Sequence, residues 1–119
     1  MTYIVCLLMS SALANEVVTA RAVSGVTRHQ VQGSAALINV ATFSYNSQRY
    51  GVRCAGEGNT LRCEIVEKAS SQVVTASDSL RICKRNNRVA VMSEDRGLSG
   101  RVIVLPDILN AAGRQQCGG

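Results

Sequence analysis

The segment from Tyr50 to Val66 constrains the fold most strongly, because apolar and polar residues alternate on both sides of a short turn sequence. Alternation with a period of two residues is typical of a strand that buries one face. The turn sequence, Gly-Glu-Gly-Asn at 56–59, supplies residues that tolerate the backbone of a tight turn. The segment therefore predicts a β-hairpin.

The register of this hairpin follows from its turn. A two-residue turn at 58–59 places Cys54 directly opposite Cys63. The same register places Arg53 opposite Glu64 on the other face. A disulfide between the two cysteines closes a loop of about ten residues, and chain entropy then contributes about 2.7 kcal/mol to stability. We therefore expect a Cys54–Cys63 disulfide.

A second hairpin is predicted over 80–92, with Asn86 and Asn87 at its turn, because asparagine tolerates the left-handed backbone that a tight turn requires. One face carries apolar side chains: Leu80, Ile82, Val89 and Val91. The other face carries basic, cysteine and small apolar side chains: Arg81, Cys83, Arg85, Arg88, Ala90 and Met92. Arg85 and Arg88 then lie opposite each other, and like charges in that position repel. Either a longer turn separates them or an anionic partner offsets the repulsion.

The rest of the chain predicts further strands and one helix. The valine-rich stretch 15–47 favours strands, although 34–40 also fits a short helix. The polar stretch 67–79 fits a short helix or an exposed connection. The apolar run 101–105 predicts a central strand, and 107–112 predicts a short helix that begins with an aspartate. The expected fold is mainly β: a small antiparallel sheet of hairpins with a short C-terminal helix, stapled by disulfides.

The N-terminal residues 1–14 have the pattern of a signal peptide. A short apolar block is followed by small residues, and an Ala-x-Ala site predicts cleavage between Ala14 and Asn15. No basic residue precedes Arg21, whereas a secretory signal ordinarily opens with lysine or arginine. The alternative is an apolar first element of a cytosolic domain. With cleavage, 15–119 forms one small β-rich domain.

The cysteines support an oxidising compartment. Cleavage of the signal removes Cys6 and leaves an even number of cysteines, as a disulfide framework needs. With Cys54 bonded to Cys63, Cys83 pairs with Cys117 or both stay free. We expect a Cys83–Cys117 disulfide, which closes a loop of about 35 residues and contributes about 3.8 kcal/mol by the same chain-entropy model.

The net charge of +5 indicates an anionic partner. Four of the thirteen basic residues cluster around the second hairpin and form the candidate partner-binding site: Arg81, Lys84, Arg85 and Arg88. A guanidinium group makes paired hydrogen bonds to carboxylates and phosphates, so this cluster suits recognition of an anion. The alternative interpretation of the cluster is a solvated turn.

The sequence favours neither catalysis nor metal binding. A free thiol at Cys83 would be activated by neighbouring Arg81 and Arg85, which makes a cysteine enzyme a third possibility, but no base stands near it in the sequence. The single histidine, His29, lies in a polar stretch and is expected at the surface. No Cys-x-x-Cys is present. We therefore expect no cofactor, no metal and no enzymatic activity.

These features predict a small exported protein, periplasmic or secreted, that acts as a binding module for an anionic surface or an acidic partner. No run of apolar residues is long enough to span a bilayer, so no transmembrane span is expected in the mature chain. The alternative is a cytosolic nucleic-acid-binding protein with reduced cysteines. Proteins that bind single strands stack bases on aromatic rings, and outside the presumed signal this chain has three such residues: Phe43, Tyr45 and Tyr50.

Overall fold

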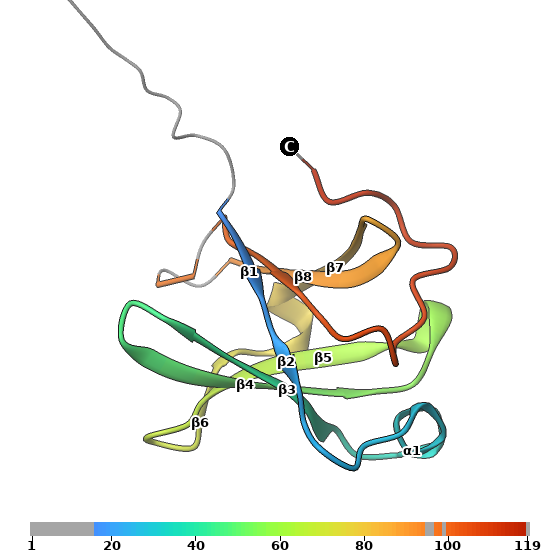
Figure 1. Ribbon diagram of the computed structural model, residues 1–119, viewed down its shortest axis with the longest axis horizontal. Helices are drawn as coiled ribbons and strands as arrows, with labels where there is room; N and C mark the ends of the chain where they lie inside the picture. Colours follow the sequence, from blue (N-terminus) through green and yellow to red (C-terminus); the bar gives the residue numbers. More distant parts are fainter. Residues whose placement is uncertain (1–15, 95–96, 99, 119) are drawn as a thin grey trace, which may run out of the picture.

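The computed structural model describes residues 16–94, 97–98 and 100–118 as two β-sheets (Figure 1). The four-stranded sheet has the order β1 (Val17–Thr19), β9 (Val102–Val104), β8 (Arg88–Ser93) and β7 (Leu80–Arg85). The five-stranded sheet has the order β2 (Arg21–Ala22), β3 (Ile38–Tyr45), β4 (Gln48–Ala55), β5 (Arg62–Glu67) and β6 (Gln72–Thr75). The predicted signal peptide, 1–14, and its cleavage site lie outside the described residues.

The two sheets share one hydrophobic core. Alternation along the strands turns Val52 and Ile65 of the five-stranded sheet inward, where they meet Val91 and Ile103 of the four-stranded sheet. All four side chains are fully buried. Phe43 closes one part of this core by stacking on the ring of Tyr50, at 5.1 Å between ring centroids. The expectation of a mainly β fold is therefore confirmed, with two sheets in place of the single sheet that was expected.

The first predicted hairpin is formed by β4 and β5, with the expected register. Cys54 pairs with Cys63 at a Cα–Cα distance of 4.1 Å, and the two form a disulfide. On the outer face, the Arg53 guanidinium lies 2.7 Å from the Glu64 carboxylate. The expected two-residue turn at 58–59 was wrong, because the structure has a longer connection there.

The strands β4 and β5 are joined by a turn of 3₁₀ helix, η2 (Gly58–Thr60). Gly56 leaves β4 with a φ of +94°, and a Cβ there would lie 2.5 Å from the carbonyl oxygen of Thr60. The close approach of this carbonyl excludes a side chain at position 56, so the turn requires glycine there.

The second predicted hairpin is formed by β7 and β8. Asn86 and Asn87 have φ values of 51° and 64°, which are the left-handed conformations of the tight turn that was expected. Arg85 therefore pairs directly with Arg88, and the alternative of a longer turn is wrong.

The first strand crosses from one sheet to the other. β1 pairs in parallel with β9, and after the buried Ala20 the chain continues as β2 in the five-stranded sheet. The Ala20 amide still donates to the Val104 carbonyl at 2.9 Å. The parallel pair departs from the expected antiparallel sheet, since it joins strands from opposite ends of the described chain that no hairpin connects.

A short helix, α1 (Arg28–Gly33), replaces part of the strand expected within 15–47. It begins at a capping box in which the Gln30 amide donates to the Thr27 hydroxyl and the Thr27 amide donates to the Gln30 side chain. Val31 anchors the helix in the core. The stretch 34–40 leads into β3, while 67–79 contains β6 and a second 3₁₀ turn, η3 (Ser77–Ser79).

The helix predicted over 107–112 is absent from the structure, which has turns there. The Arg28 guanidinium donates to the carbonyls of Asp107 and Ile108, at 3.1 Å each, and so takes up acceptors that a helix would use for its own amides. Leu109 and Ala111 are both buried, which fixes the segment against the core in an irregular conformation.

The C-terminal tail is fastened along the outer edge of β7. The Lys84 amide donates to the Gln115 carbonyl at 2.8 Å, and the Cys117 amide donates to the Lys84 carbonyl at 2.9 Å. Cys83 and Cys117 form the second expected disulfide, at a Cα–Cα distance of 4.9 Å. The tail therefore covers an edge that would otherwise expose unpaired backbone groups.

Candidate anion-binding site

The strongest candidate site lies on the outer face of the four-stranded sheet, at its β7–β8 turn. An open cavity of about 400 Å³ lies there, which we call the arginine cleft. It is lined by residues of four strands and one turn: Val17, Thr19, Arg85, Asn86, Arg88 and Val104. The cleft thus combines the predicted basic turn with two strands that the sequence does not place near it.

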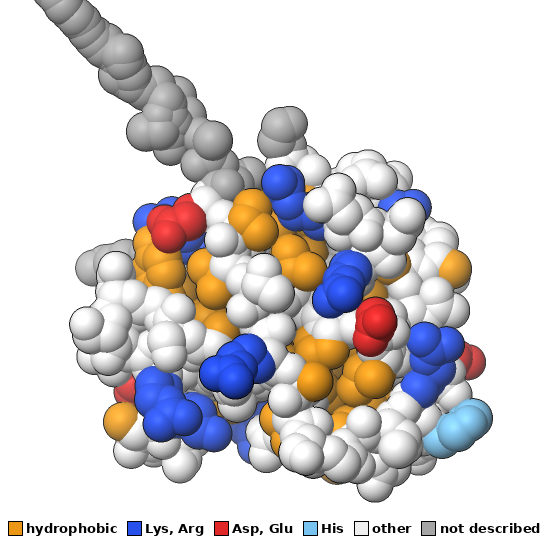
Figure 2. Space-filling view, viewed as in Figure 1, with side chains coloured by type: hydrophobic (Ala, Val, Ile, Leu, Met, Phe, Trp, Pro, Cys, Tyr) orange, Lys and Arg blue, Asp and Glu red, His pale blue; other side chains and the backbone are white. Residues whose placement is uncertain are grey.

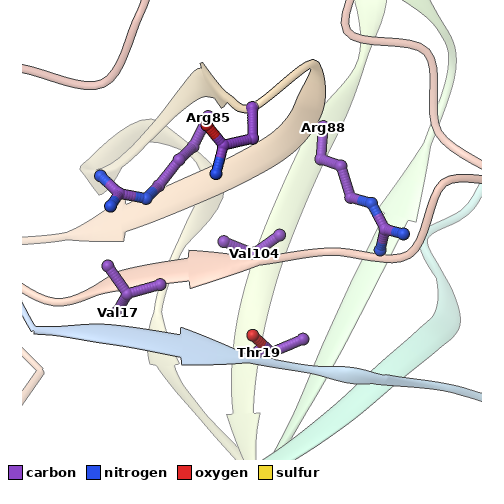
Figure 3. A pocket seen from close by; sticks show the side chains of 6 residues that line it. Val17, Thr19, Arg85, Arg88 and Val104 are labelled. Carbon is purple, nitrogen blue, oxygen red and sulfur yellow. The ribbon is translucent and has the colours of Figure 1, made fainter.

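The strand register brings the two arginines together. Pairing of Arg85 with Arg88 places both side chains on the outer face. Figure 3 shows their guanidinium groups at opposite ends of the arginine cleft, with Val104 between them. Both residues are exposed to solvent. Because the left-handed turn fixes the two Cα positions, the spacing of the pair is set by the backbone.

Both guanidinium groups are chemically available. Among the residues that the structure describes, neither Arg85 nor Arg88 has a hydrogen-bond or ion-pair partner for its side chain. Each therefore retains donors that can form paired hydrogen bonds to a carboxylate or a phosphate. A ligand with negative charge would also relieve the repulsion between the two cations.

The floor of the arginine cleft combines two valines with a threonine. Val17 and Thr19 of β1 lie beside Val104 of β9, because the parallel ladder pairs Thr19 with Val104 and Val17 with Val102. Val17 is 39% exposed, one of the few large aliphatic side chains that the described surface leaves open to solvent. We call Val17, Thr19 and Val104 the aliphatic floor. A bound group can therefore place apolar surface on these side chains beside its negative charge.

The other two predicted site residues are placed differently. Arg81 lies on the same face, but its guanidinium contacts the sulfur of Met92 at 3.5 Å and lies near Gly118 of the tail. Lys84 pairs with Val89 and therefore belongs to the opposite face, while its backbone holds the tail. The structure thus brings Arg85 and Arg88 together in one cavity and leaves Arg81 and Lys84 outside it.

Most other arginines stabilise the fold. Arg62 donates to the carbonyl of Ala35 at 3.0 Å, and Arg114 donates to that of Gly58 at 2.6 Å. Arg101 forms an ion pair with Glu16 at 3.4 Å. These contacts account for part of the basic excess within the fold itself. The net charge therefore overstates the number of arginines that are available to bind a partner.

A rival basic groove of about 440 Å³ lies between two turns of the five-stranded sheet. It is lined by Ser47, Gln48, Arg49, Lys68 and Ala69. The Lys68 amide donates to the Arg49 carbonyl at 2.9 Å, which holds the two turns together. This groove offers one guanidinium where the arginine cleft offers two, so it is the weaker site for paired hydrogen bonds.

The cysteine and the histidine considered as catalytic or metal-binding residues are placed as follows. Cys83 is bonded to Cys117, so the thiol that a cysteine enzyme requires is in a disulfide. His29 is exposed on α1. Within the described ranges there is no group of three or more potential metal ligands, and no helix is long and apolar enough to cross a membrane.

The aromatic rings give no platform for nucleic-acid bases in the described part of the chain. Phe43 and Tyr50 are buried against each other, and the Tyr45 hydroxyl and ring both contact Arg101. Base stacking on exposed rings supplies much of the affinity of proteins that bind single strands.

Comparisons of the chain with models of protein families, with curated proteins and with solved structures found no match.

Proposed function

We propose that this protein is a non-enzymatic binding module that recognises an anionic partner through Arg85 and Arg88. One observation carries the proposal: two exposed guanidinium groups lie on paired residues, at opposite ends of a cavity, and neither has a partner among the described residues. Like charges directly opposite each other are unfavourable, so an anionic ligand that pairs with both would relieve the repulsion.

The compartment belongs to the same proposal. Two disulfides are characteristic of proteins that mature outside the reducing cytosol, and the Ala-x-Ala pattern before Asn15 fits removal of a signal peptide. We therefore propose a periplasmic or extracellular protein. Alkylation of free thiols before reduction, followed by intact-mass measurement, tests this directly. A chain that begins at Asn15 and carries no alkyl group agrees with it, and a full-length chain alkylated at every cysteine contradicts it.

The binding proposal is tested with a charge-reversed pair and a matched control. The test variant is Arg85→Glu/Arg88→Glu, in which both residues are exposed and bear no fold contact among the described residues. The control is Arg49→Glu/Lys68→Glu, which changes the net charge by the same amount in the rival basic groove. Retention of each oxidised protein on immobilised polyglutamate is measured as salt is raised.

We expect the test variant to lose at least about tenfold in affinity, since charge-assisted hydrogen bonds each contribute about 1.5–3 kcal/mol. The control should lose much less, because its cations lie outside the arginine cleft. Equal losses in the two variants would mean that only net charge matters. Retention by the test variant would overturn the proposal, provided that its circular dichroism spectrum matches that of the unchanged protein.

A further inference from the structure

The aliphatic floor restricts which anions can fill the arginine cleft. A hydrated polyanion gains nothing from Val17 and Val104, because burial of apolar surface is favourable only against other apolar surface. A ligand that uses the whole cavity would place an apolar group against Val104 and a negative group on either side of it, where Figure 3 shows the guanidinium groups of Arg85 and Arg88.

The charges that line the arginine cleft favour a short ligand. Arg85 and Arg88 are its two charged lining residues, while Arg81 and Lys84 of the same hairpin lie outside it. Figure 2 shows lysine and arginine side chains dispersed over the face in view, with hydrophobic and uncharged surface between them. A long polyanion tracks a continuous basic stripe, whereas a local pair of cations suits a local pair of anionic groups.

An extended acidic peptide has the required chemistry. In an extended chain, side chains two residues apart point to the same side, at about 6.6 Å along the strand. A segment with an acidic residue, an aliphatic residue and an acidic residue at alternate positions therefore presents two carboxylates on either side of an apolar group. Its carboxylates would pair with the guanidinium groups of Arg85 and Arg88, and its aliphatic side chain would lie against the floor.

We propose that the partner is an acidic protein segment of this kind, with an aliphatic residue between two acidic residues at alternate positions. The inference rests on the proposed function and narrows it to one class of partner. It assigns the carboxylates to Arg85 and Arg88 and the aliphatic side chain to Val17, Thr19 and Val104.

The test uses two peptides that differ in one side chain. Both carry glutamate at alternate positions around a central residue, which is leucine in one peptide and serine in the other, with glycine and serine elsewhere. Binding of each fluorescent peptide to the oxidised protein is measured by anisotropy. We expect the leucine peptide to bind about fivefold or more tightly than the serine peptide, because its side chain becomes partly buried.

Variants of the floor separate this inference from the proposed function. Val17→Thr and Thr19→Ser alter exposed positions of β1 and change little else, so at least one of them will fold. Either should bring the ratio between the two affinities towards one, chiefly by weakening the binding of the leucine peptide. Arg85→Gln/Arg88→Gln should weaken the binding of both peptides by a similar factor.

Three results would overturn the inference. Equal binding of the two peptides that still depends on Arg85 and Arg88 would leave the proposed function standing and refute the aliphatic requirement. Tighter, arginine-dependent binding of an oligonucleotide or of phosphatidylglycerol vesicles would do the same. Peptide binding that is unaffected by Arg85→Gln/Arg88→Gln would refute both the inference and the proposed function.

Discussion

Arg85 and Arg88 lie directly opposite each other at the end of the β7–β8 ladder, joined by a turn of two asparagines in left-handed conformations. Like charges in this position lower stability by about 0.2–1 kcal/mol. The same arrangement holds two guanidinium groups at opposite ends of one cavity. The turn therefore creates an unfavourable pair in the free protein and a ready site for an anion.

Replacing Arg85 with glutamate should stabilise the protein and impair its binding. In Arg85→Glu the repulsion with Arg88 becomes an attraction, so we expect the free energy of unfolding in urea to rise by about 0.5–1 kcal/mol at low salt. Retention on polyglutamate should fall in the same variant. The gain in stability should shrink at high salt, where exposed charges are screened. A loss of stability at low salt would show that Arg85 supports the fold.

The Arg53–Glu64 pair should contribute to stability. The Nε atom of Arg53 is buried without a hydrogen-bond partner, so the guanidinium depends on the Glu64 carboxylate 2.7 Å away. We expect Glu64→Gln to lower the free energy of unfolding by about 1–2 kcal/mol. Asp78→Asn is the control, because it removes the same charge at an exposed position. Equal effects of the two substitutions would exclude a specific role for the pair.

The turn between β4 and β5 should tolerate only glycine at position 56. A Cβ on Gly56 would meet the Thr60 carbonyl oxygen at 2.5 Å, and its φ of +94° is unfavourable for other residues. We expect Gly56→Ala to lower the free energy of unfolding by more than about 1 kcal/mol. Gly33→Ala, at the end of α1 with no atom within 4 Å of the added carbon, should leave it unchanged or raise it. The opposite order of the two variants would contradict the described turn.

The second disulfide should control the C-terminal tail. In Cys83→Ala/Cys117→Ala, the loss of a cross-link that spans 34 positions should lower the free energy of unfolding by up to about 3.8 kcal/mol. Limited proteolysis should then cut first within 114–118. The control, Cys54→Ala/Cys63→Ala, should destabilise the core and leave the tail protected under native conditions. Early cleavage of the tail in both variants would indicate that the second disulfide does not hold it.

The hairpins could be predicted from the sequence because their information is local. The asparagine pair at 86–87 sets the register of β7 and β8, and a turn centred on 58–59 sets that of β4 and β5, which places Cys54 opposite Cys63. In each case the residues that set the register lie at the turn. The Cys83–Cys117 disulfide followed by elimination once the first pair was placed.

Other features depend on contacts between distant parts of the chain. The helix expected at 107–112 is replaced by turns, and Arg28, about 80 positions away, binds two of its carbonyls. The capping box of Thr27 and Gln30 was a local signal for α1 that the β-branched valines around it obscured. The aliphatic floor arises from the parallel pairing of β1 with β9, and no sequence pattern specifies that pairing.

The most direct test of the proposed site is an NMR titration of the oxidised, ¹⁵N-labelled protein with an acidic peptide. We expect the largest shift changes in the backbone and guanidinium signals of Arg85 and Arg88, together with the amides of Val17, Thr19 and Val104. The signals of Arg49 and Lys68 should move little. Changes centred on those two residues, or spread evenly over all basic residues, would contradict recognition by the arginine cleft.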